Sequence, residues 1–434
     1  MGVILVFLAI VFVLLLILIG TPLFGVIGGL TLYFFTSIDL STNAIITEIS
    51  KISRAPGIIA LPLFTFTGYL LAESKASERM IRLSSAFLSW LPGGMAVVVL
   101  VAGSIFTALT GANALAIIAI GGLLLPALIK SGFEEDFSLG LVTTSGSLGL
   151  LFVPSLPIII YALISQVDTV LLFIAGVLPG SLLVLVLIIY SVWHGHKIKI
   201  PTERMSISTI LGAINESKWE IPLPFVIVIG IFTGIITVGE AAAVSAAYAI
   251  ITECFIYRDI GFKKLLDVVV DSMVMVGALM CILGLALGLT NYLIDQQIPQ
   301  AMMEFIQKHI SSKLGFLMAL NGFLLIAGCM MDIFSAILVL VPLIAPIADG
   351  YGIDPVHLGI VFLSNMTIGY LTPPIGMNLF VASVRFQEPI VRLFRVVIPF
   401  FILNILVLLV ITYWPKLSLL LIDMMGKRPE LLTI

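Results

Sequence analysis

Residues 145–157 read SGSLGLLFVPSLP, and residues 365–378 read NMTIGYLTPPIGMN. Both stretches lie inside long apolar segments, and both combine glycine with proline. A proline lacks the backbone N–H and clashes with the carbonyl four residues earlier, so a helix is interrupted there. The two stretches therefore predict two broken helices, whose freed carbonyls need partners from elsewhere in the protein.

The two stretches belong to an internal repeat. A shift of 220 residues superposes Gly149 on Gly369 and Pro154 on Pro374. The same shift superposes Gly57 on Gly277, Gly68 on Gly288, Ala116-Ile117 on Ala336-Ile337, Pro126 on Pro346, Gly132 on Gly352, and Pro179 on Pro399. One register that holds over residues 57–179 is hard to obtain by chance. We therefore expect a first repeat at residues 1–215 and a second at residues 216–434.

The composition places both repeats in a membrane. Of the 434 residues, 60% are hydrophobic and 10% are charged, whereas a soluble protein carries about 25% charged residues. A helix needs about 20 apolar residues to cross a bilayer. Such segments are predicted at residues 3–19, 22–38, 57–72, 139–163, 170–192, 221–238, 240–256, 269–291, 356–384 and 396–413. The predicted fold class is an all-α integral membrane protein of about ten transmembrane helices.

Two further apolar stretches, about 94–130 and 314–350, are too long for one crossing. The first is interrupted at Thr110-Gly111-Ala112-Asn113 and the second at Met330-Met331-Asp332. Each is predicted to be a re-entrant helical hairpin, which enters the membrane and returns on the same side. Each half then has an odd number of crossings, so the second half is inverted relative to the first. Inverted repeats with broken helices near the midplane are typical of alternating-access transporters.

The basic residues give an orientation. With alternating crossings, 14 lysines and arginines lie on one side and 7 on the other. The richer side is expected to be cytoplasmic, and Arg79 and Arg258 are counted among its loop residues. Both termini are then predicted to be periplasmic.

The helix breaks and the hairpin tips form the predicted binding site. Helix N-termini attract carboxylates, carbonyls suit a hard cation such as sodium, and an acidic residue at membrane depth is a functional candidate. The predicted substrate and sodium site comprises Thr110, Gly111, Asn113, Ser145, Gly146, Ser147, Gly149, Val153, Pro154, Asp332, Asn365, Thr367, Gly369, Thr372, Pro373, Pro374, Gly376 and Asn378. Sodium itself is expected at Thr110, Asn113, Gly146, Asp332, Gly369 and Thr372.

Several of these residues also have a purely structural interpretation. Asp332 could cap a half-helix, Thr110 could bond back within its own helix, and Glu240 could be a solvated loop charge. The scattered histidines lack the spacing of a metal site, and the cysteines suit small core positions. These residues are His194, His196, His309, His357, Cys254, Cys281 and Cys329.

Other functional classes fit less well. An intramembrane protease needs a Ser–His pair, an HExxH helix or paired aspartates. The histidines are predicted near loops, HExxH is absent, and Asp332 has no acidic partner at depth. We therefore expect neither an enzyme nor an organic cofactor, and no nucleic-acid partner. A channel also uses broken helices, but a pair of inverted hairpins favours a carrier.

The chain contains a series of different short motifs. They are Leu61-Pro62-Leu63-Phe64, Leu91-Pro92-Gly93-Gly94, Gly132-Phe133, Gly146-Ser147-Leu148-Gly149-Leu150-Leu151, Ser155-Leu156-Pro157, Glu240-Ala241-Ala242-Ala243-Val244, Met331-Asp332, Gly352-Ile353-Asp354-Pro355-Val356-His357 and Thr372-Pro373-Pro374-Ile375-Gly376. Together they resemble the large membrane subunit of tripartite ATP-independent periplasmic (TRAP) transporters, and the resemblance covers about residues 2–415. The resemblance implies a sodium-driven importer of carboxylates in the bacterial inner membrane, working as an elevator in the lipid bilayer. It also implies two partners, a small four-helix membrane subunit and a periplasmic substrate-binding protein.

The chain departs from the usual pattern of that family at four places. The first tip usually reads Ser-Gly-Ser, where this chain has Thr110-Gly111-Ala112. Val153 and Ile333 each replace a proline, and Val238-Gly239 replaces Pro-Thr before Glu240. The differences concern mainly the first-half ion site. The alternative function is a self-sufficient sodium/dicarboxylate symporter.

Overall fold

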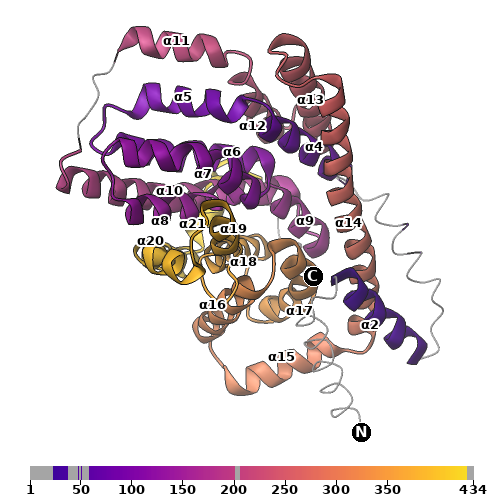
Figure 1. The fold of residues 1–434 in the computed structure, drawn as a ribbon. Coiled ribbons are helices and arrows are strands. Elements are labelled where there is room, and N and C mark those ends of the chain that lie inside the picture. The colour runs from indigo at the N-terminus through magenta and orange to yellow at the C-terminus, as the bar shows by residue number, and fades with distance from the viewer. Residues whose placement is uncertain (1–22, 38–46, 48–49, 51–57, 201–205, 428–434) are drawn as a thin grey trace.

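The computed structural model describes residues 23–37, 47, 50, 58–200 and 206–427 (Figure 1). Every regular element in these ranges is a helix, which confirms the all-α fold class. The predicted span 3–19 lies outside the described residues.

The helices fall into two runs. The first run is α2 (Leu23–Ser37), α4 (Ala60–Glu73), α5 (Ala76–Leu88), α6 (Gly94–Thr110), α7 (Asn113–Lys130), α8 (Glu135–Ser145), η1 (Leu148–Leu151), α9 (Leu156–Ser165) and α10 (Thr169–Lys197). The second is α11 (Ile207–Ser217), α12 (Pro222–Thr233), α13 (Val238–Ile250), η2 (Ile251–Ile256), α14 (Phe262–Asp295), α15 (Ile298–His309), α16 (Lys313–Met330), α17 (Ile333–Gly350), α18 (Pro355–Gly369), α19 (Met377–Phe386), α20 (Ile390–Tyr413) and α21 (Lys416–Met424).

The helix bounds follow the register of the repeat. A shift of 220 residues carries α7 onto α17 end to end, and it carries α5, α6, α8, α9 and α10 onto α15, α16, α18, α19 and α20 within a few residues. The order of elements is therefore the same in both runs. The division at residues 215 and 216, and the inversion of the second half, stay predictions.

Both hairpins and both broken helices are interrupted at the predicted positions. Hairpin 1 (α6 and α7) turns at residues 111–112, and hairpin 2 (α16 and α17) turns at residues 331–332. In the first broken helix, the segment Glu135–Leu151 meets α9 at a bend of 44°. In the second, α18 and α19 are separated by residues 370–376. The peptide bonds Val153–Pro154 and Pro373–Pro374 are both cis.

The predicted number of ten spans is not confirmed. Seven helices of the described ranges are long and apolar enough to cross a membrane, or eight if the bent pair counts as one span. One reason is that α12 ends at Thr233, short of the predicted residue 238, and α13 starts a new helix at Val238. A capping box explains this start, since Thr237 N donates to Glu240 Oε2 at 2.8 Å and Glu240 N donates to Thr237 Oγ1 at 3.2 Å. Glu240 is thus a helix-capping residue on the surface.

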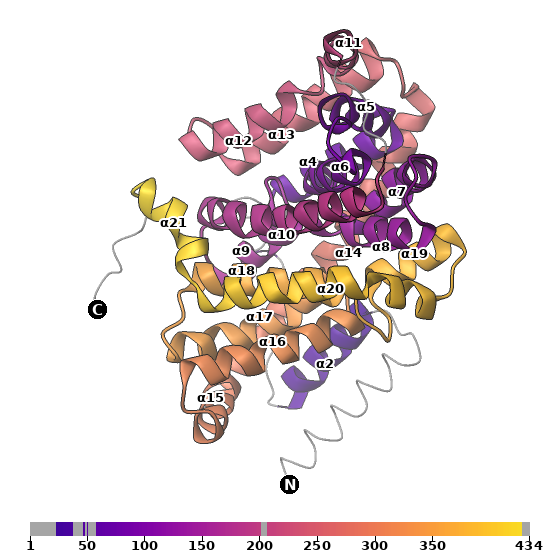
Figure 2. The same cartoon turned by 90° about the vertical axis from the view of Figure 1, so that its left-hand side faces the viewer.

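Three amphipathic helices, α5, α11 and α15, were not predicted. Each is short and amphipathic rather than apolar throughout, so none matches the pattern of a spanning segment. Helix α5 packs between α6 and α11, and α15 packs against α17. Figures 1 and 2 both show α5 and α11 side by side at one end of the molecule and α15 at the opposite end.

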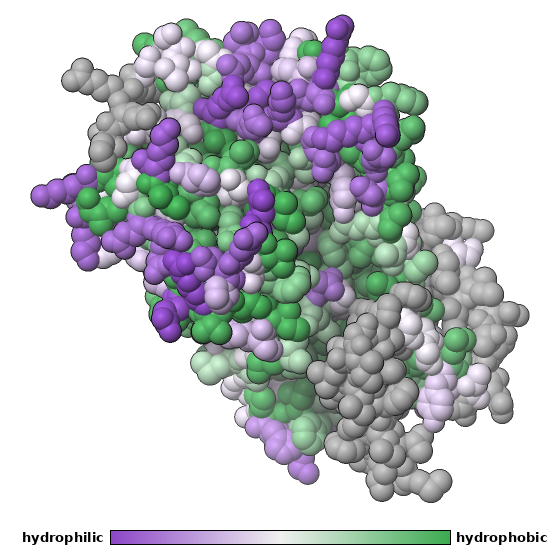
Figure 3. All heavy atoms as spheres, viewed as in Figure 1, coloured by the Kyte–Doolittle hydropathy of each residue, from purple (hydrophilic) through white to green (hydrophobic). Residues whose placement is uncertain are grey.

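Helices α4, α13 and α14 pack together around a small core that includes Phe66, Leu70 and Ala246. The larger core is formed by the hairpins, the broken helices, α10 and α20, and residues of α4, α12, α13 and α14 also contribute to it. Large apolar side chains such as Phe225 on α12 and Val274 on α14 are 60% and 66% exposed, and Figure 3 shows much hydrophobic surface. Surface of this kind suits contact with lipid.

Candidate functional site

The two helix breaks touch each other. Ser147 Oγ donates to the carbonyl of Thr367 at 3.3 Å, and these residues are 220 positions apart. They are therefore equivalent residues of the two repeats. Equivalent residues of a repeat pair come into contact only close to the axis that relates the repeats. The breaks thus lie at the centre of the repeat pair.

Asn378, at the start of α19, joins both breaks to the tip of hairpin 1. Its Nδ2 donates to the Thr143 carbonyl at 3.0 Å and to Ser147 Oγ at 3.1 Å. Its Oδ1 accepts from Asn113 Nδ2 at 2.8 Å. The side chain is fully buried, so one amide connects three segments that are distant in sequence.

The tip of hairpin 1 depends on a glycine. Gly111 has φ +65°, in the left-handed region that favours glycine, and a Cβ there would lie 2.5 Å from Leu156 Cγ. Thr110 Oγ1 donates back to the Phe106 carbonyl at 2.8 Å, which confirms its structural interpretation. The hydroxyl that reaches the first break is instead that of Thr107, which donates to the Gly146 carbonyl at 3.0 Å. The sequence analysis did not identify Thr107.

Each break presses against the first arm of its own hairpin. A Cβ on Gly149 would lie 2.2 Å from the Ser104 carbonyl oxygen and 2.6 Å from Ala108 N. A Cβ on Gly369 would lie 2.8 Å from the Cα of Gly328. Ala108 and Gly328 are also equivalent under the shift of 220. Both halves therefore bring backbone against backbone at matching places.

Asp332 caps α17, as one of its two interpretations predicted. Its Oδ2 accepts from Phe334 N at 3.0 Å and from Ser335 N at 3.1 Å, and its Oδ1 accepts from the Ser335 hydroxyl. The neighbouring Ile333 N donates to the Tyr370 hydroxyl at 2.5 Å, so the second tip lies beside the second break. Within the described residues Asp332 forms no ion pair. The geometry leaves a half-buried carboxylate without a cationic partner.

The two breaks differ in exposure. Val153 and Pro154 in the first are buried, whereas Pro373 and Pro374 in the second are exposed. Two hydrogen bonds to backbone carbonyls stabilise the second break. Gly376 N donates to the Cys329 carbonyl at 3.0 Å, and Thr372 Oγ1 donates to the Gly369 carbonyl at 2.7 Å. The second break is therefore the more accessible one.

Three predicted site residues point elsewhere. Asn365 Nδ2 donates to Asn321 Oδ1 on α16 at 2.7 Å. Ser145 Oγ and Thr367 Oγ1 bond back to the carbonyls of Val142 and Leu363. A polar side chain in an apolar helix takes the nearest polar partner, which periodicity alone does not identify. Within the described residues, no hydrogen bond joins Asp332 to Thr110 or Asn113.

The histidine predictions need correction. His194 lies within α10 and stacks on Phe137 at 4.2 Å between ring centroids. His357 lies in the first turn of α18 and is 1% exposed. Its ring nitrogens lie 3.3 Å from Ser418 Oγ and 3.2 Å from the Thr412 carbonyl. This Ser–His pair is buried in the core, and its contact links α21 to α18.

The cysteines and the remaining acidic groups suggest no metal centre. The described ranges contain no group of three or more His, Cys, Asp or Glu side chains that could hold a metal ion. The cysteines are free, and Cys281 is exposed, contrary to the expected core position.

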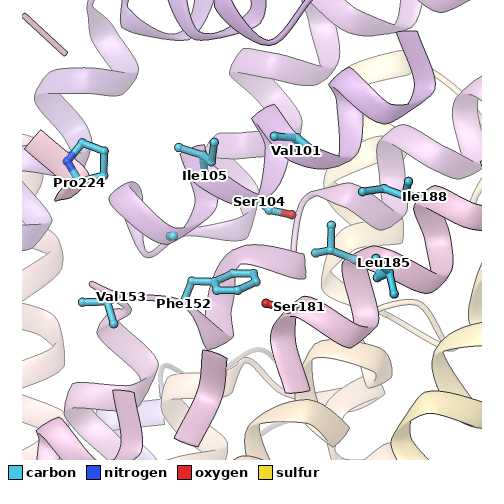
Figure 4. A pocket seen from close by; sticks show the side chains of 11 residues that line it. Val101, Ser104, Ile105, Phe152, Val153, Ser181, Leu185, Ile188 and Pro224 are labelled. Carbon is cyan, nitrogen blue, oxygen red and sulfur yellow. The ribbon is translucent and has the colours of Figure 1, made fainter. Parts of the chain in front are cut away.

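An apolar cavity of about 360 Å³ borders the first break (Figure 4). Phe152 and Val153 line it from the break, Val101 and Ile105 from α6, and Pro224 from α12. Ser104 and Ser181 supply its polar groups, as Figure 4 shows. The cavity therefore lies between α6, α10 and the first break, and α12 borders it at Pro224.

Residues 6–417 match the family described as "Tripartite ATP-independent periplasmic transporter, DctM component". The chain belongs to this family. It is 33% identical over 403 residues to the C4-dicarboxylate TRAP transporter large permease protein DctM of Pseudomonas aeruginosa, with 93% of this chain and 94% of the relative covered. The resemblance seen in the sequence is thereby confirmed, and the chain is a multi-pass membrane protein of a TRAP transporter.

Other relatives carry different names. The isethionate TRAP transporter permease protein DctMQ of Oleidesulfovibrio alaskensis is 33% identical over 364 residues, which cover 83% of this chain and 57% of that relative. The ectoine TRAP transporter large permease protein TeaC of Halomonas elongata is 28% identical over 372 residues, covering 86% and 87%. The YdaH transporter of Alcanivorax borkumensis shares the fold, with a TM-score of 0.54, 12% identity, and 96% and 99% of the chains covered.

Proposed function

We propose that this TRAP permease is the sodium-coupled carrier subunit of an importer for a small organic anion, such as a C4-dicarboxylate or a sugar acid. The names of its relatives refer to C4-dicarboxylate, isethionate and ectoine. They are all permeases, in keeping with a transport role rather than an enzymatic one. The proposed location is the bacterial inner membrane.

The observation that carries the proposal is the junction at Asn378. One buried amide connects Asn113 of hairpin 1 to Ser147 of the first break and stands at the start of α19 after the second. A solute or ion bound at this junction would contact both repeats at once. Alternating access requires such a central site, because the two repeats move around it.

The charges at the junction suit an anion together with a cation. Helices α9 and α19 start directly after the two breaks, and a helix N-terminus attracts a carboxylate. Asp332 is half-buried and forms no ion pair within the described residues. A carboxylate at this depth favours a bound cation, and we assign that role to sodium.

The cavity of Figure 4 supports an elevator movement. It lies between α6, α10 and the first break, with α12 at its border, and its lining residues are nearly all apolar. Apolar contacts are non-directional, so sliding along this seam breaks no fixed hydrogen bonds. In this account the hairpins and broken helices move against α4, α12, α13 and α14.

Membership of the TRAP family also supports two partners, a small four-helix membrane subunit and a periplasmic binding protein. Reconstitution in proteoliposomes tests this part of the proposal. The solute is first identified by thermal shift of the purified binding protein against a set of organic acids. Uptake should then require all three proteins. Robust uptake by this chain alone would instead support the self-sufficient symporter, and unsaturable currents would indicate a pore.

A further inference from the structure

Arg79 on α5 lies in the centre of a buried cluster of carboxylates. Its Nε lies 2.5 Å from Glu220 Oε1, its Nη2 2.8 Å from Glu253 Oε2, and its Nη1 2.6 Å from Asp259 Oδ2. The four side chains are at most 10% exposed. The Arg79 guanidinium also stacks over the Tyr257 ring, 3.9 Å from its centroid. The cluster fastens α5 to the residues before α12 and to η2.

One guanidinium does not balance three carboxylates. If all groups are ionised, one positive and three negative charges leave a net charge of −2. Glu220 Oε2 is buried and has no hydrogen-bond donor within the described residues. Glu253 has the Ser74 hydroxyl beside it, which also lies 3.1 Å from the Leu71 carbonyl. An uncompensated buried charge is strongly unfavourable, so the cluster needs at least one further positive charge.

A charged pocket reaches the cluster. It has a volume of about 520 Å³ and is lined by Arg79 and Tyr257 together with residues of α5 and α11. The lining side chains include Lys75, Arg82 and Lys218 against Glu78 and Glu216. Figure 3 shows hydrophilic side chains gathered over this end of the molecule. A basic mouth repels metal cations, whereas water in the pocket can deliver a proton to a carboxylate oxygen.

We propose that Glu220 is a proton-binding site, and that its bound proton holds α5 in place against α12 and η2. A proton on Oε2 turns an orphan acceptor into a hydroxyl group. It also lowers the excess charge around Arg79 by one.

The shift of the Glu220 pKa agrees with the geometry, because a buried carboxylate with an unpaired oxygen favours the protonated form. The pKa of Glu220 is raised to about 8, because burial and the nearby carboxylates Glu253 and Asp259 together outweigh the opposing effect of Arg79. The groups that face the cluster from the neighbouring elements are Arg79 on α5, Glu253 on η2, Tyr248 on α13, and Tyr257 and Asp259 in the loop after η2. Because the folded pKa is raised, the protonated form stabilises the fold. This stability is complete below pH 4.5 and is lost as the pH rises through about 8.

The cluster also affects hairpin 1. Helix α5 packs directly on α6, the first arm of that hairpin. The Ser217 hydroxyl donates to the Arg79 carbonyl at 3.3 Å, so α11 is held by the same residue. Loss of the proton therefore weakens the support of α5 and α6 together. In the predicted topology this end of the molecule faces the cytoplasm.

Infrared difference spectroscopy of the purified full chain tests the proposal directly. When the pH is raised through 8, the carboxylic-acid carbonyl band should disappear with a midpoint near that pH. Glu220→Gln should lack this band, and its melting temperature should stay constant over a range in which that of the wild type falls. Glu216→Gln is the matched control, because Glu216 is exposed and pairs with Arg82 at 3.1 Å. Its spectrum and its melting curve should match the wild type.

Three results would contradict the proposal. The first is a titrating band of full amplitude in Glu220→Gln. The second is a titration midpoint that moves when sodium replaces choline at constant ionic strength, since the site would then hold a metal cation. The third result applies if Glu220→Gln does not fold, and it uses wild-type protein labelled with ¹³C-glutamate. A titrating band that keeps its frequency with this label would come from a group other than glutamate and would contradict the proposal.

Discussion

At the scale of single residues, the helix cap formed by Asp332 is compatible with the proposed sodium site. Its Oδ2 caps α17 through two backbone N–H groups, and its Oδ1 accepts from the Ser335 hydroxyl. These three hydrogen bonds use three of the roughly four lone-pair sites of the carboxylate, and one site on Oδ1 is left for a cation. The cap therefore orients the carboxylate and does not exclude sodium.

Asp332→Asn separates the cap from the charge. Asparagine caps a helix about as well as aspartate, whereas alanine costs about 1 kcal/mol. Folding should therefore survive, while the sodium concentration for half-maximal uptake should rise tenfold for each ~1.4 kcal/mol of ion binding lost. Asp354→Asn is the matched control, since Asp354 caps α18 through Val356 N at 2.9 Å and His357 N at 3.3 Å. Unchanged sodium dependence in well-expressed Asp332→Asn would leave Asp332 as a cap alone.

Asn378→Leu tests the junction of the two repeats. The change leaves Asn113 Nδ2, the Thr143 carbonyl and Ser147 Oγ without this partner. Each buried polar group left unsatisfied costs about 1–3 kcal/mol, so the melting temperature and the uptake rate should both fall. The control is Asn404→Leu on α20, because Asn404 is 2% exposed and its Oδ1 has no partner within the described residues. Equal loss of stability in the two variants would contradict the account.

The sequence could predict which segments form the site but not which side chains meet. Gly111, Gly149 and Gly369 follow from backbone requirements that a repeat makes visible. The contact between Asn113 and Asn378 spans 265 residues, and no periodic pattern reports it. Arg79 was interpreted as a loop charge, because its partners Glu220 and Glu253 are far away in the sequence.

At the scale of elements, the close packing of each break on its hairpin sets the geometry of the site. Gly149→Ala would place a Cβ 2.2 Å from the Ser104 carbonyl oxygen, which is backbone and cannot rotate away. Overpacking of this kind costs about 1–3 kcal/mol, so the melting temperature should fall and sodium affinity should weaken. Gly212→Ala on α11 is the control, because nothing lies within 4 Å of its added Cβ. There, a gain of up to about 1 kcal/mol is expected. Equal stability of the two variants would show that the break is loosely packed.

The elements that could be predicted are those with a strong sequence pattern. Hairpins and breaks carry Gly, Pro and Asp inside apolar runs, and their interruptions lie where the sequence placed them. The helices α5, α11 and α15 are amphipathic and lie between such runs, so a search for spans passes over them. The end of α12 at Thr233 depends on the capping box of the next helix, which the apolar pattern hides.

At the scale of the whole molecule, the orientation in the membrane stays a prediction. The burial of Arg79 removes one residue from the basic loops, and the bias is then 13 to 7. The richer side is still the predicted cytoplasmic side, so both termini should be periplasmic. A C-terminal fusion to alkaline phosphatase should be active, and a fusion to green fluorescent protein should be dark. The reverse pattern would overturn the topology.

Sodium coupling is the central claim, and uptake driven by a sodium gradient tests it most directly. The chain is reconstituted in proteoliposomes with its small subunit and its binding protein loaded with the identified solute. Uptake is measured against external sodium, with choline as the replacement at constant pH and membrane potential. Because each repeat contributes a break and a hairpin tip, we expect at least two sodium sites and a Hill coefficient above one. Equal uptake in choline and in sodium would contradict the account.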